Sequence, residues 1–401
     1  MSFHTRLNEI LEHCQLVNAP QGGFRKLIPW NHGYLLIEKS SDMSVVKRNI
    51  EAIYVDPAWR YVSLRWFTDR LLKFCAEKLF ESKKFSKIDE DFLKSEVANM
   101  PNIEVTVIRE VTGASFYKAS PPVRIGKFII YDWAQHSEII LQHCQHEFDA
   151  SFMKENKHRI LAECKVTAAE SRKVSELATL AFQELESLIT FIVGSRSFEF
   201  SLVNYAGPRE SFTYTISSDS FGYSVDSPEN FEVNLSAPVF QDPPPYIGKL
   251  ISINEASANA LERKICRSID WTAQALREPN MGSAFIKAMI ALESLLKIDE
   301  QGGFAPSIVA QISEATAQIL GSSIEECIHI ASDIKRLYGI RSSAVHSGSN
   351  DIKQDDLSKI INYTRQIIFT LLNEEKFQPL DSPKKLGQFL TEAKYSNTLG
   401  M

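Results

Sequence analysis

Helical periodicity runs almost without a break through the last third of this 401-residue sequence, and no other feature limits the fold as strongly. Apolar residues recur at the spacing of one helical face in five stretches, at 255–276, 283–296, 306–319, 324–338 and 355–372. Nothing in these stretches alternates with the period of two that a half-buried strand requires. The pattern therefore predicts an all-helical bundle of about 150 residues, which is a normal domain size.

A proline-rich segment precedes this bundle. Residues 238–248 read Pro-Val-Phe-Gln-Asp-Pro-Pro-Pro-Tyr-Ile-Gly. Consecutive prolines remove backbone donors and favour extended geometry, so we expect both helix and sheet to stop there. This predicts a division into a mixed region over residues 1–245 and a helical domain over residues 246–401.

The first 245 residues show mixed signals. Asp56-Pro57 has the form of an N-cap followed by proline at the first helical position, and it predicts a helix to about Lys84. A second, long helix is expected to begin near Thr167. Runs rich in β-branched and aromatic residues predict strands at 103–111, 127–133, 160–166, 198–205, 212–217 and 231–235. The fold class is therefore α+β, with a mixed N-terminal region of one or two subdomains before the helical bundle.

The composition is that of a globular protein, with 44% hydrophobic and 23% charged residues. The net charge of −6 argues against a wholly basic nucleic-acid coat, although a local basic cleft needs only a few Lys and Arg. No apolar run resembles a signal peptide or a membrane span, so a cytoplasmic location is expected. Scattered cysteines without a Cys-x-x-Cys pair indicate reduced thiols: Cys14, Cys75, Cys144, Cys164, Cys266 and Cys327.

One segment of the helical region carries candidate chemistry. It reads Leu337-Tyr-Gly-Ile-Arg341-Ser-Ser-Ala-Val-His346-Ser-Gly348. Arginine stays charged and presents a fork of donors to phosphate oxygens, whereas histidine titrates near neutrality and can act as acid or base. Both residue types are suited to RNA cleavage without metal, in which a base deprotonates a 2′-hydroxyl and an acid protonates the leaving 5′-oxygen.

This segment resembles the Arg-x4–6-His motif of HEPN domains, in particular those called Apea-like. The matching residues are Tyr338, Arg341, Ser342, His346 and Gly348, together with an upstream Ala291-Leu292-Glu293. The family usually has glycine directly after the histidine, whereas Ser347 is inserted here. Arg6 with His13 and Arg25 with His32 also satisfy the spacing, but they lie outside the helical region. The resemblance covers about 120 to 150 residues and says nothing about the first 245.

The resemblance implies a metal-independent endoribonuclease that needs no cofactor, with Arg341 and His346 as catalytic residues and RNA as partner. It also implies a role in bacterial antiviral defence. Because an always-active nuclease would be toxic, we expect the N-terminal region to sense a trigger or to hold the site closed. Glu293 could orient Arg341, or it could be a solvated surface carboxylate. Tyr338 and Ser342 could contact RNA phosphate, although a tyrosine at that position more often anchors helix packing.

The spacing of the motif adds a prediction about assembly. Five residues along an ideal helix place the side chains of Arg341 and His346 about 140° apart. Two copies of the motif meeting across a dimer would build one site more easily than a single copy, and HEPN families commonly form such dimers. We therefore expect a homodimer through the helical domain.

Several alternatives remain open from the residues alone. A HEPN module without activity could act as an RNA-binding or protein scaffold, with Arg341 in a salt bridge and His346 as a C-cap. A metal site could form within a polar cluster that matches no closed zinc signature and is more simply a solvated helix: His136, His143, Cys144, His146, Glu147 and Asp149. A basic N-terminal helix could touch nucleic acid, although its aromatic residues more often belong to a core: Arg60, Arg65, Arg70, Lys73 and Lys78 among Trp59, Trp66 and Phe67. Phosphate-loop, dinucleotide-binding and Gly-x-Ser-x-Gly motifs are absent.

Overall fold

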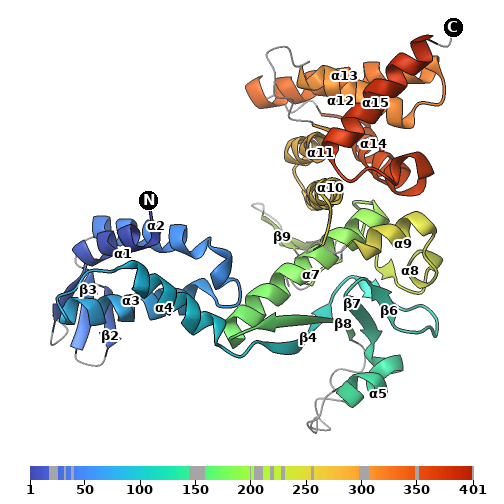
Figure 1. Cartoon of the computed structure of the whole chain (residues 1–401). Helices are drawn as coiled ribbons and strands as arrows, with labels where there is room; N and C mark the ends of the chain where they lie inside the picture. The colour runs from blue at the N-terminus through green and yellow to red at the C-terminus, as the bar shows by residue number, and fades with distance from the viewer. Residues whose placement is uncertain are drawn as a thin grey trace. The chain divides into compact units, whose positions relative to one another are not determined.

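The computed structural model describes twelve stretches of the chain. They are residues 1–17, 26–30, 33–37, 40–143, 159–198, 200–202, 211–216, 221–226, 231–253, 257–297, 307–347 and 352–399. For some of these residues, His346 and Ser347 among them, only the backbone is described. The architecture is mixed α+β with an all-helical C-terminal region, as the periodicity predicted (Figure 1).

Contacts along the chain group it into two compact units. The first unit comprises residues 1–107 and 165–180, and the second comprises residues 108–164 and 181–401. The boundaries between them fall inside β4 (Ile103–Val111), β8 (Ile160–Ala168) and α7 (Ser171–Val193). The proline-rich segment lies within the second unit, and the proposed domain division at residue 245 stays a prediction.

The first unit packs helices against a small antiparallel sheet of order β1-β3-β2. Its elements are α1 (Phe3–Glu12), β1 (Gln15–Val17), β2 (Lys26–Trp30), β3 (Gly33–Ile37), α2 (Ser40–Tyr54), η1 (Pro57–Trp59), α3 (Leu64–Phe80) and α4 (Lys87–Ala98). The predicted cap is confirmed, because Asp56 accepts a hydrogen bond from the Ala58 N–H. The helix expected from there to Lys84 is two elements instead, since Ser63 caps a new helix by accepting from the Trp66 N–H.

A four-stranded sheet has the strand order β4-β8-β7-β6. β6 (Val123–Ile125) and β7 (Phe128–Asp132) form a hairpin, and β7 pairs antiparallel with β8. The three strands predicted at 103–111, 127–133 and 160–166 correspond to β4, β7 and β8. α5 (Trp133–His143) follows β7, and Trp133 and Ile140 pack with Tyr131 in one buried cluster.

Two smaller sheets complete the strands of the second unit. β5 (Ala114–Ser115) pairs with β11 (Val233–Asn234), and β9 (Ser211–Ile216) forms a hairpin with β10 (Phe221–Asp226). β9 covers residues 212–216 of the strand predicted at 212–217, and residue 217 lies outside the described part. Of the strand predicted at 198–205, the described residues show isolated bridges at Phe198 and Ser201, and residues 199 and 203–205 lie outside the described part.

The expectation that regular structure stops between residues 238 and 248 is wrong. Two short helices form there, α8 (Pro238–Gln241) and α9 (Pro245–Ser252). Both begin with proline, which costs nothing in the first turn, because the N–H that it lacks would have no partner inside the helix. α9 is packed rather than exposed: Ile247 and Leu250 are buried, and the Tyr246 ring lies 5.1 Å from that of Phe369.

The helical bundle contains all five predicted helices. They are α10 (Ala260–Arg277), α11 (Met281–Leu296), α12 (Ile308–Leu320), α13 (Ile324–Ser347) and α14 (Gln354–Asn373), and they are followed by η2 (Glu375–Phe377) and α15 (Pro383–Leu399). α13 runs to Ser347, nine residues beyond the expected end at Tyr338, because a single exposed glycine does not stop a helix. None of the described helices is long and apolar enough to cross a membrane.

Candidate functional site

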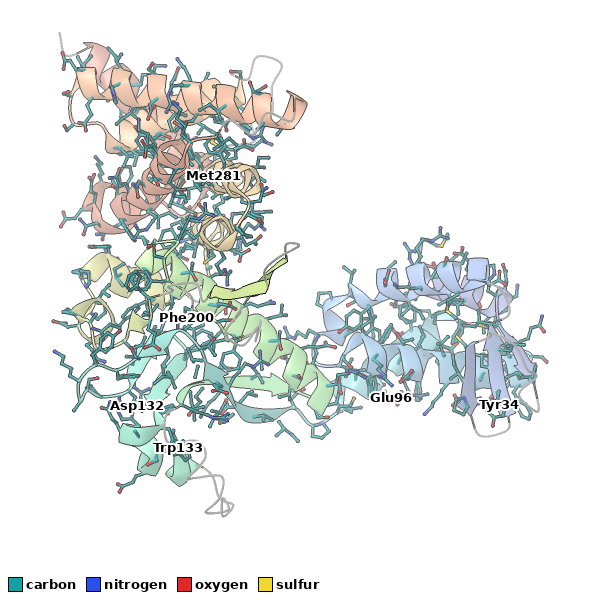
Figure 2. The ribbon with its side chains drawn as sticks, turned by 180° about the vertical axis from the view of Figure 1, so that it is seen from behind. Tyr34, Glu96, Asp132, Trp133, Phe200 and Met281 are labelled. Carbon is teal, nitrogen blue, oxygen red and sulfur yellow. The ribbon has the colours of Figure 1, made fainter. Side chains whose placement is uncertain are left out.

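The candidate site lies where α13 packs against α11. Leu292 and Leu296 of α11 are buried, as are Leu337 and Tyr338 of α13. These apolar residues set the face of each helix that turns inward, and they leave Glu293 and Arg341 at the edge of the interface. Figure 2 shows the side chains of this region, with Met281 labelled at the start of α11.

Glu293 and Arg341 meet across this interface. The distance between Arg341 Nε and Glu293 Oε1 is 3.2 Å, with the two side chains 32% and 17% exposed, respectively. The contact is close enough for an ion pair, but its angle falls outside hydrogen-bond geometry. Of the two interpretations of Glu293, the structure therefore favours the partner of Arg341 over a solvated surface carboxylate.

Tyr338 belongs to the same cluster. It lies one turn before Arg341 on α13 and is 6% exposed. Burial, followed by the negative charge of Glu293, raises the pKa of the Tyr338 phenol well above its usual value, so the phenol stays protonated. A hydroxyl at this depth is placed for contact with other helices rather than with RNA.

The cluster contains three buried polar atoms without a hydrogen bond. Glu293 Oε1, Tyr338 Oη and Arg341 Nε are each shielded from solvent, and none makes a hydrogen bond to the part of the chain that the structure describes. Buried polar atoms are usually satisfied, and leaving one unsatisfied costs about 1–3 kcal/mol. Three of them gathered at one contact distinguish this place from the ordinary interior.

Ser342 and His346 complete the predicted site along α13. Ser342 is exposed. His346 lies in the last turn of the helix, and its side chain falls outside the described residues, as does Gly348. Because α13 is helical through both motif positions, the spacing of about 140° between residues 341 and 346 applies to this chain.

A second charged cluster lies near the site and has a structural role. Arg336 donates to Asp333 at 2.9 Å and lies 2.8 Å from a carboxylate oxygen of Asp356 on α14. Tyr363 donates to Asp333 at 3.2 Å, and Lys359 approaches the same carboxylate at 3.5 Å. Both aspartates are buried, so these contacts compensate their charges and tie α13 to α14.

The alternative metal site around His136 is not supported. Of the residues proposed for it, His136 is the one whose side chain the structure describes. His136 is 6% exposed, not solvated as expected. Its Nδ1 accepts the Asp132 N–H at 3.0 Å, and its Nε2 donates to the Ser120 carbonyl at 2.8 Å. With both ring nitrogens engaged, His136 is a satisfied core histidine. The His143 side chain and residues 144–149 lie outside the described part; among the described residues no group of His, Cys, Asp and Glu could hold a metal.

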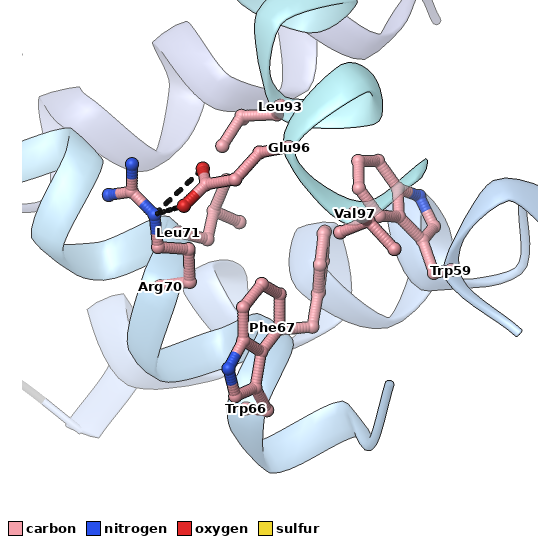
Figure 3. A pocket seen from close by; sticks show the side chains of 8 residues that line it. All are labelled: Trp59, Trp66, Phe67, Arg70, Leu71, Leu93, Glu96 and Val97. Carbon is pink, nitrogen blue, oxygen red and sulfur yellow. Dashed lines mark hydrogen bonds and ion pairs between the residues drawn. The ribbon is translucent and has the colours of Figure 1, made fainter. Parts of the chain in front are cut away.

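The basic helix predicted near the N-terminus contributes aromatic residues to the hydrophobic core of the first unit. Trp59 and Phe67 are almost fully buried, which confirms the interpretation of these aromatic residues as core. Figure 3 shows them beside a shallow hollow between α3 and α4, whose border includes an ion pair between Arg70 and Glu96. Arg70 Nε lies 2.8 Å from one Glu96 oxygen, so this arginine holds α3 to α4 rather than standing free.

Comparison with known proteins leaves the site without a relative. No family model matches the chain, and no curated protein or solved structure is similar to it. Sequence reasoning had singled out Arg341 and Tyr338 and had offered Glu293 as a possible partner of Arg341. It missed that the Tyr338 phenol lies beside the Glu293 carboxylate, because these residues come from different helices and no sequence pattern records the contact.

Proposed function

We propose that this chain is a metal-independent endoribonuclease in which Arg341 and His346 cleave RNA. The observation that carries the proposal is the arrangement of Arg341. Its Nε faces the partly buried carboxylate of Glu293, while the side chain as a whole keeps 32% of its surface exposed. An arginine held by one edge can offer its terminal amino groups to an anion, and phosphate fits that planar fork.

The two residues would divide the chemistry between them. The 2′-hydroxyl attacks the adjacent phosphorus, its proton passes to a base, and the 5′-oxygen leaves with a proton from an acid. His346 can supply the acid or the base, and Arg341 stabilises the negative charge that grows on the phosphoryl oxygens. The products are a 2′,3′-cyclic phosphate and a 5′-hydroxyl, and the reaction uses neither a metal nor a cofactor.

Total cellular RNA incubated with the full chain in chelator tests this proposal. We expect cleavage by the wild type, with a loss of at least about 10²-fold in Arg341→Ala and in His346→Ala. His329→Ala and Lys335→Ala are matched controls, since both residues are exposed on the same helix and should leave activity unchanged. Equal cleavage by wild type and His346→Ala would overturn the catalytic assignment.

The Arg341–Glu293 pair also suits a second candidate, a HEPN-like module that binds RNA or a protein without cutting. An arginine that pairs with a carboxylate from a neighbouring helix can serve packing alone. In that case Arg341→Ala would lower the melting temperature, and no RNA cleavage would be found in any variant. A role in antiviral defence follows from the resemblance and stays a prediction. Gating by the N-terminal region, expected because an always-active nuclease would be toxic, and the cytoplasmic location expected from the sequence also stay predictions.

A further inference from the structure

The three buried atoms at the candidate site that lack a hydrogen bond are chemically complementary. Arg341 Nε and the Tyr338 hydroxyl are donors, and Glu293 Oε1 is an acceptor with lone pairs for both. The Nε–Oε1 distance is already 3.2 Å, within the range of a hydrogen bond. A rotation of the carboxylate would bring the Nε–Oε1 contact into hydrogen-bond geometry, and the phenolic O–H beside this carboxylate can turn toward it.

Tyr338 is suited to act as a donor in such a contact. The phenol is buried, has no other hydrogen-bond partner in the described part of the chain, and stays protonated at neutral pH. Glu293, which lies on α11, is an acceptor that both Tyr338 and Arg341 of α13 can use. A phenol that holds one carboxylate in place thereby also restricts where the arginine beside it can lie.

We propose that Tyr338 is a positioning residue that donates its O–H to Glu293, and that the carboxylate held in this way fixes Arg341 by its Nε edge. The terminal amino groups of Arg341 then stay turned toward the phosphate of an RNA substrate. The inference rests on the proposed ribonuclease function and adds to it the route by which the arginine is oriented. A tyrosine that only fills space between helices would not need its hydroxyl.

A second phenol in the same bundle provides a matched control. Tyr363 donates to Asp333 at 3.2 Å, and this carboxylate is also buried between α13 and α14. Tyr363→Phe therefore removes a phenol–carboxylate contact of the same kind without touching Arg341. Comparison of Tyr338→Phe with Tyr363→Phe separates an effect on the site from a general effect on packing.

Kinetics of the full chain test the proposal first. We expect Tyr338→Phe to lower kcat/KM by about two- to tenfold, the scale of one neutral hydrogen bond, and Glu293→Gln by about 10- to 100-fold. The losses should fall on kcat, while binding of an uncleavable 2′-O-methyl oligoribonucleotide changes little. Adding Tyr338→Phe to Glu293→Gln should cost nothing further, because the phenol acts through the carboxylate. Tyr363→Phe should keep wild-type kinetics.

Chemical modification of Arg341 tests the same contact without any enzymatic activity. A dicarbonyl reagent attacks the terminal amino groups of arginine, and peptide mass spectrometry reports the rate at each residue. Tyr338→Phe should change the rate at Arg341 and leave Arg277 unchanged, since Arg277 pairs with Glu186 elsewhere in the second unit. An altered rate at Arg341 in a chain that cleaves no RNA would refute the ribonuclease but keep the positioning contact.

Two results would overturn the inference. One is a Tyr338→Phe variant with wild-type kinetics and a wild-type modification rate at Arg341, which would make the phenol a packing group. The other is a gain of RNA affinity in Glu293→Gln, which would mean that the carboxylate competes with phosphate for Arg341 instead of orienting it.

Discussion

The end of helix α7 depends on a glycine that a methyl group should disrupt. Gly194 follows the helix with φ of +67°, in the left-handed region, and its N–H donates to the Thr190 carbonyl at 2.8 Å. Arg365 of α14 covers this end. It donates to the Phe191 carbonyl at 3.1 Å and to the Ile192 carbonyl at 2.9 Å, so a guanidinium satisfies carbonyls that the helix leaves open.

The expected loss for Gly194→Ala can be estimated from these contacts. A Cβ at position 194 would lie 2.6 Å from Arg365 Nε and closer still to its Cζ. Left-handed backbone costs a non-glycine residue about 1–2 kcal/mol. Displacing Arg365 also forfeits two hydrogen bonds from a charged group, worth about 1.5–3 kcal/mol each, unless water replaces them. With partial replacement by water, we expect a loss of about 4 kcal/mol in the free energy of unfolding.

Thermal unfolding of the full chain measures this loss. About 4 kcal/mol corresponds to a drop of roughly 8 °C or more on the scale for domains of 150–250 residues. Gly248→Ala and Gly339→Ala are controls, because no atom lies within 4 Å of the added Cβ at either helical position. Both controls should be neutral or should stabilise by up to about 1 kcal/mol.

A double-variant cycle identifies the source of the loss. In the Arg365→Met background the guanidinium is gone, and Gly194→Ala should then cost only the strain of the left-handed backbone, about 1–2 kcal/mol. Equal costs of Gly194→Ala in both backgrounds would refute the clash with Arg365. A melting temperature unchanged by Gly194→Ala would refute the whole account of this helix end.

Two further predictions concern assembly and pH. If Arg341 and His346 of two copies form one site, the working particle should have twice the mass of one chain. When subunits exchange, an excess of His346→Ala subunits should lower wild-type activity by more than dilution alone predicts. A fully active monomer would contradict this prediction. Burial alone would raise the pKa of Asp333, but a hydrogen bond and charge from Arg336 hold it below its ordinary value of 3.8. The ionised carboxylate thus stabilises the fold above pH 3.8. The melting temperature of the wild type should exceed that of Asp333→Asn at neutral pH, and this difference should shrink as the pH falls below 3.8. A difference that does not change with pH would contradict the prediction.

Local patterns in the sequence determined most of the elements. The strand predicted at 103–111 has the same bounds as β4, and each of the five predicted helices of the last third is present. Apolar periodicity and caps act within a few residues of the chain, so they can be read without knowing the neighbours. Asp56 is such a case, because its carboxylate caps the Ala58 N–H two residues away.

Where packing competes with a local signal, the sequence was a poorer guide. The prolines at 238 and 245 predicted an interruption but begin helices, and apolar residues of α9 bury against α14. His136 looked like part of a solvated cluster, yet the fold buries it and satisfies both of its ring nitrogens. The contacts between α9 and α14, and between His136 and the Ser120 carbonyl, join parts of the chain that no local pattern relates.

The candidate site divides in the same way. The sequence alone picked out Arg341 and His346 as a pair and named Glu293 and Tyr338 as companions, whereas the structure extends one helix through both motif positions. Only the tertiary structure decided that Glu293 turns toward Arg341 instead of solvent, that Tyr338 is buried beside that carboxylate, and that Arg365 closes the end of α7. A helix's own pattern shows which of its faces is apolar. Which polar residue at the edge of that face meets which partner depends on how the helices pack, because side chains from separate helices become neighbours only in the folded chain.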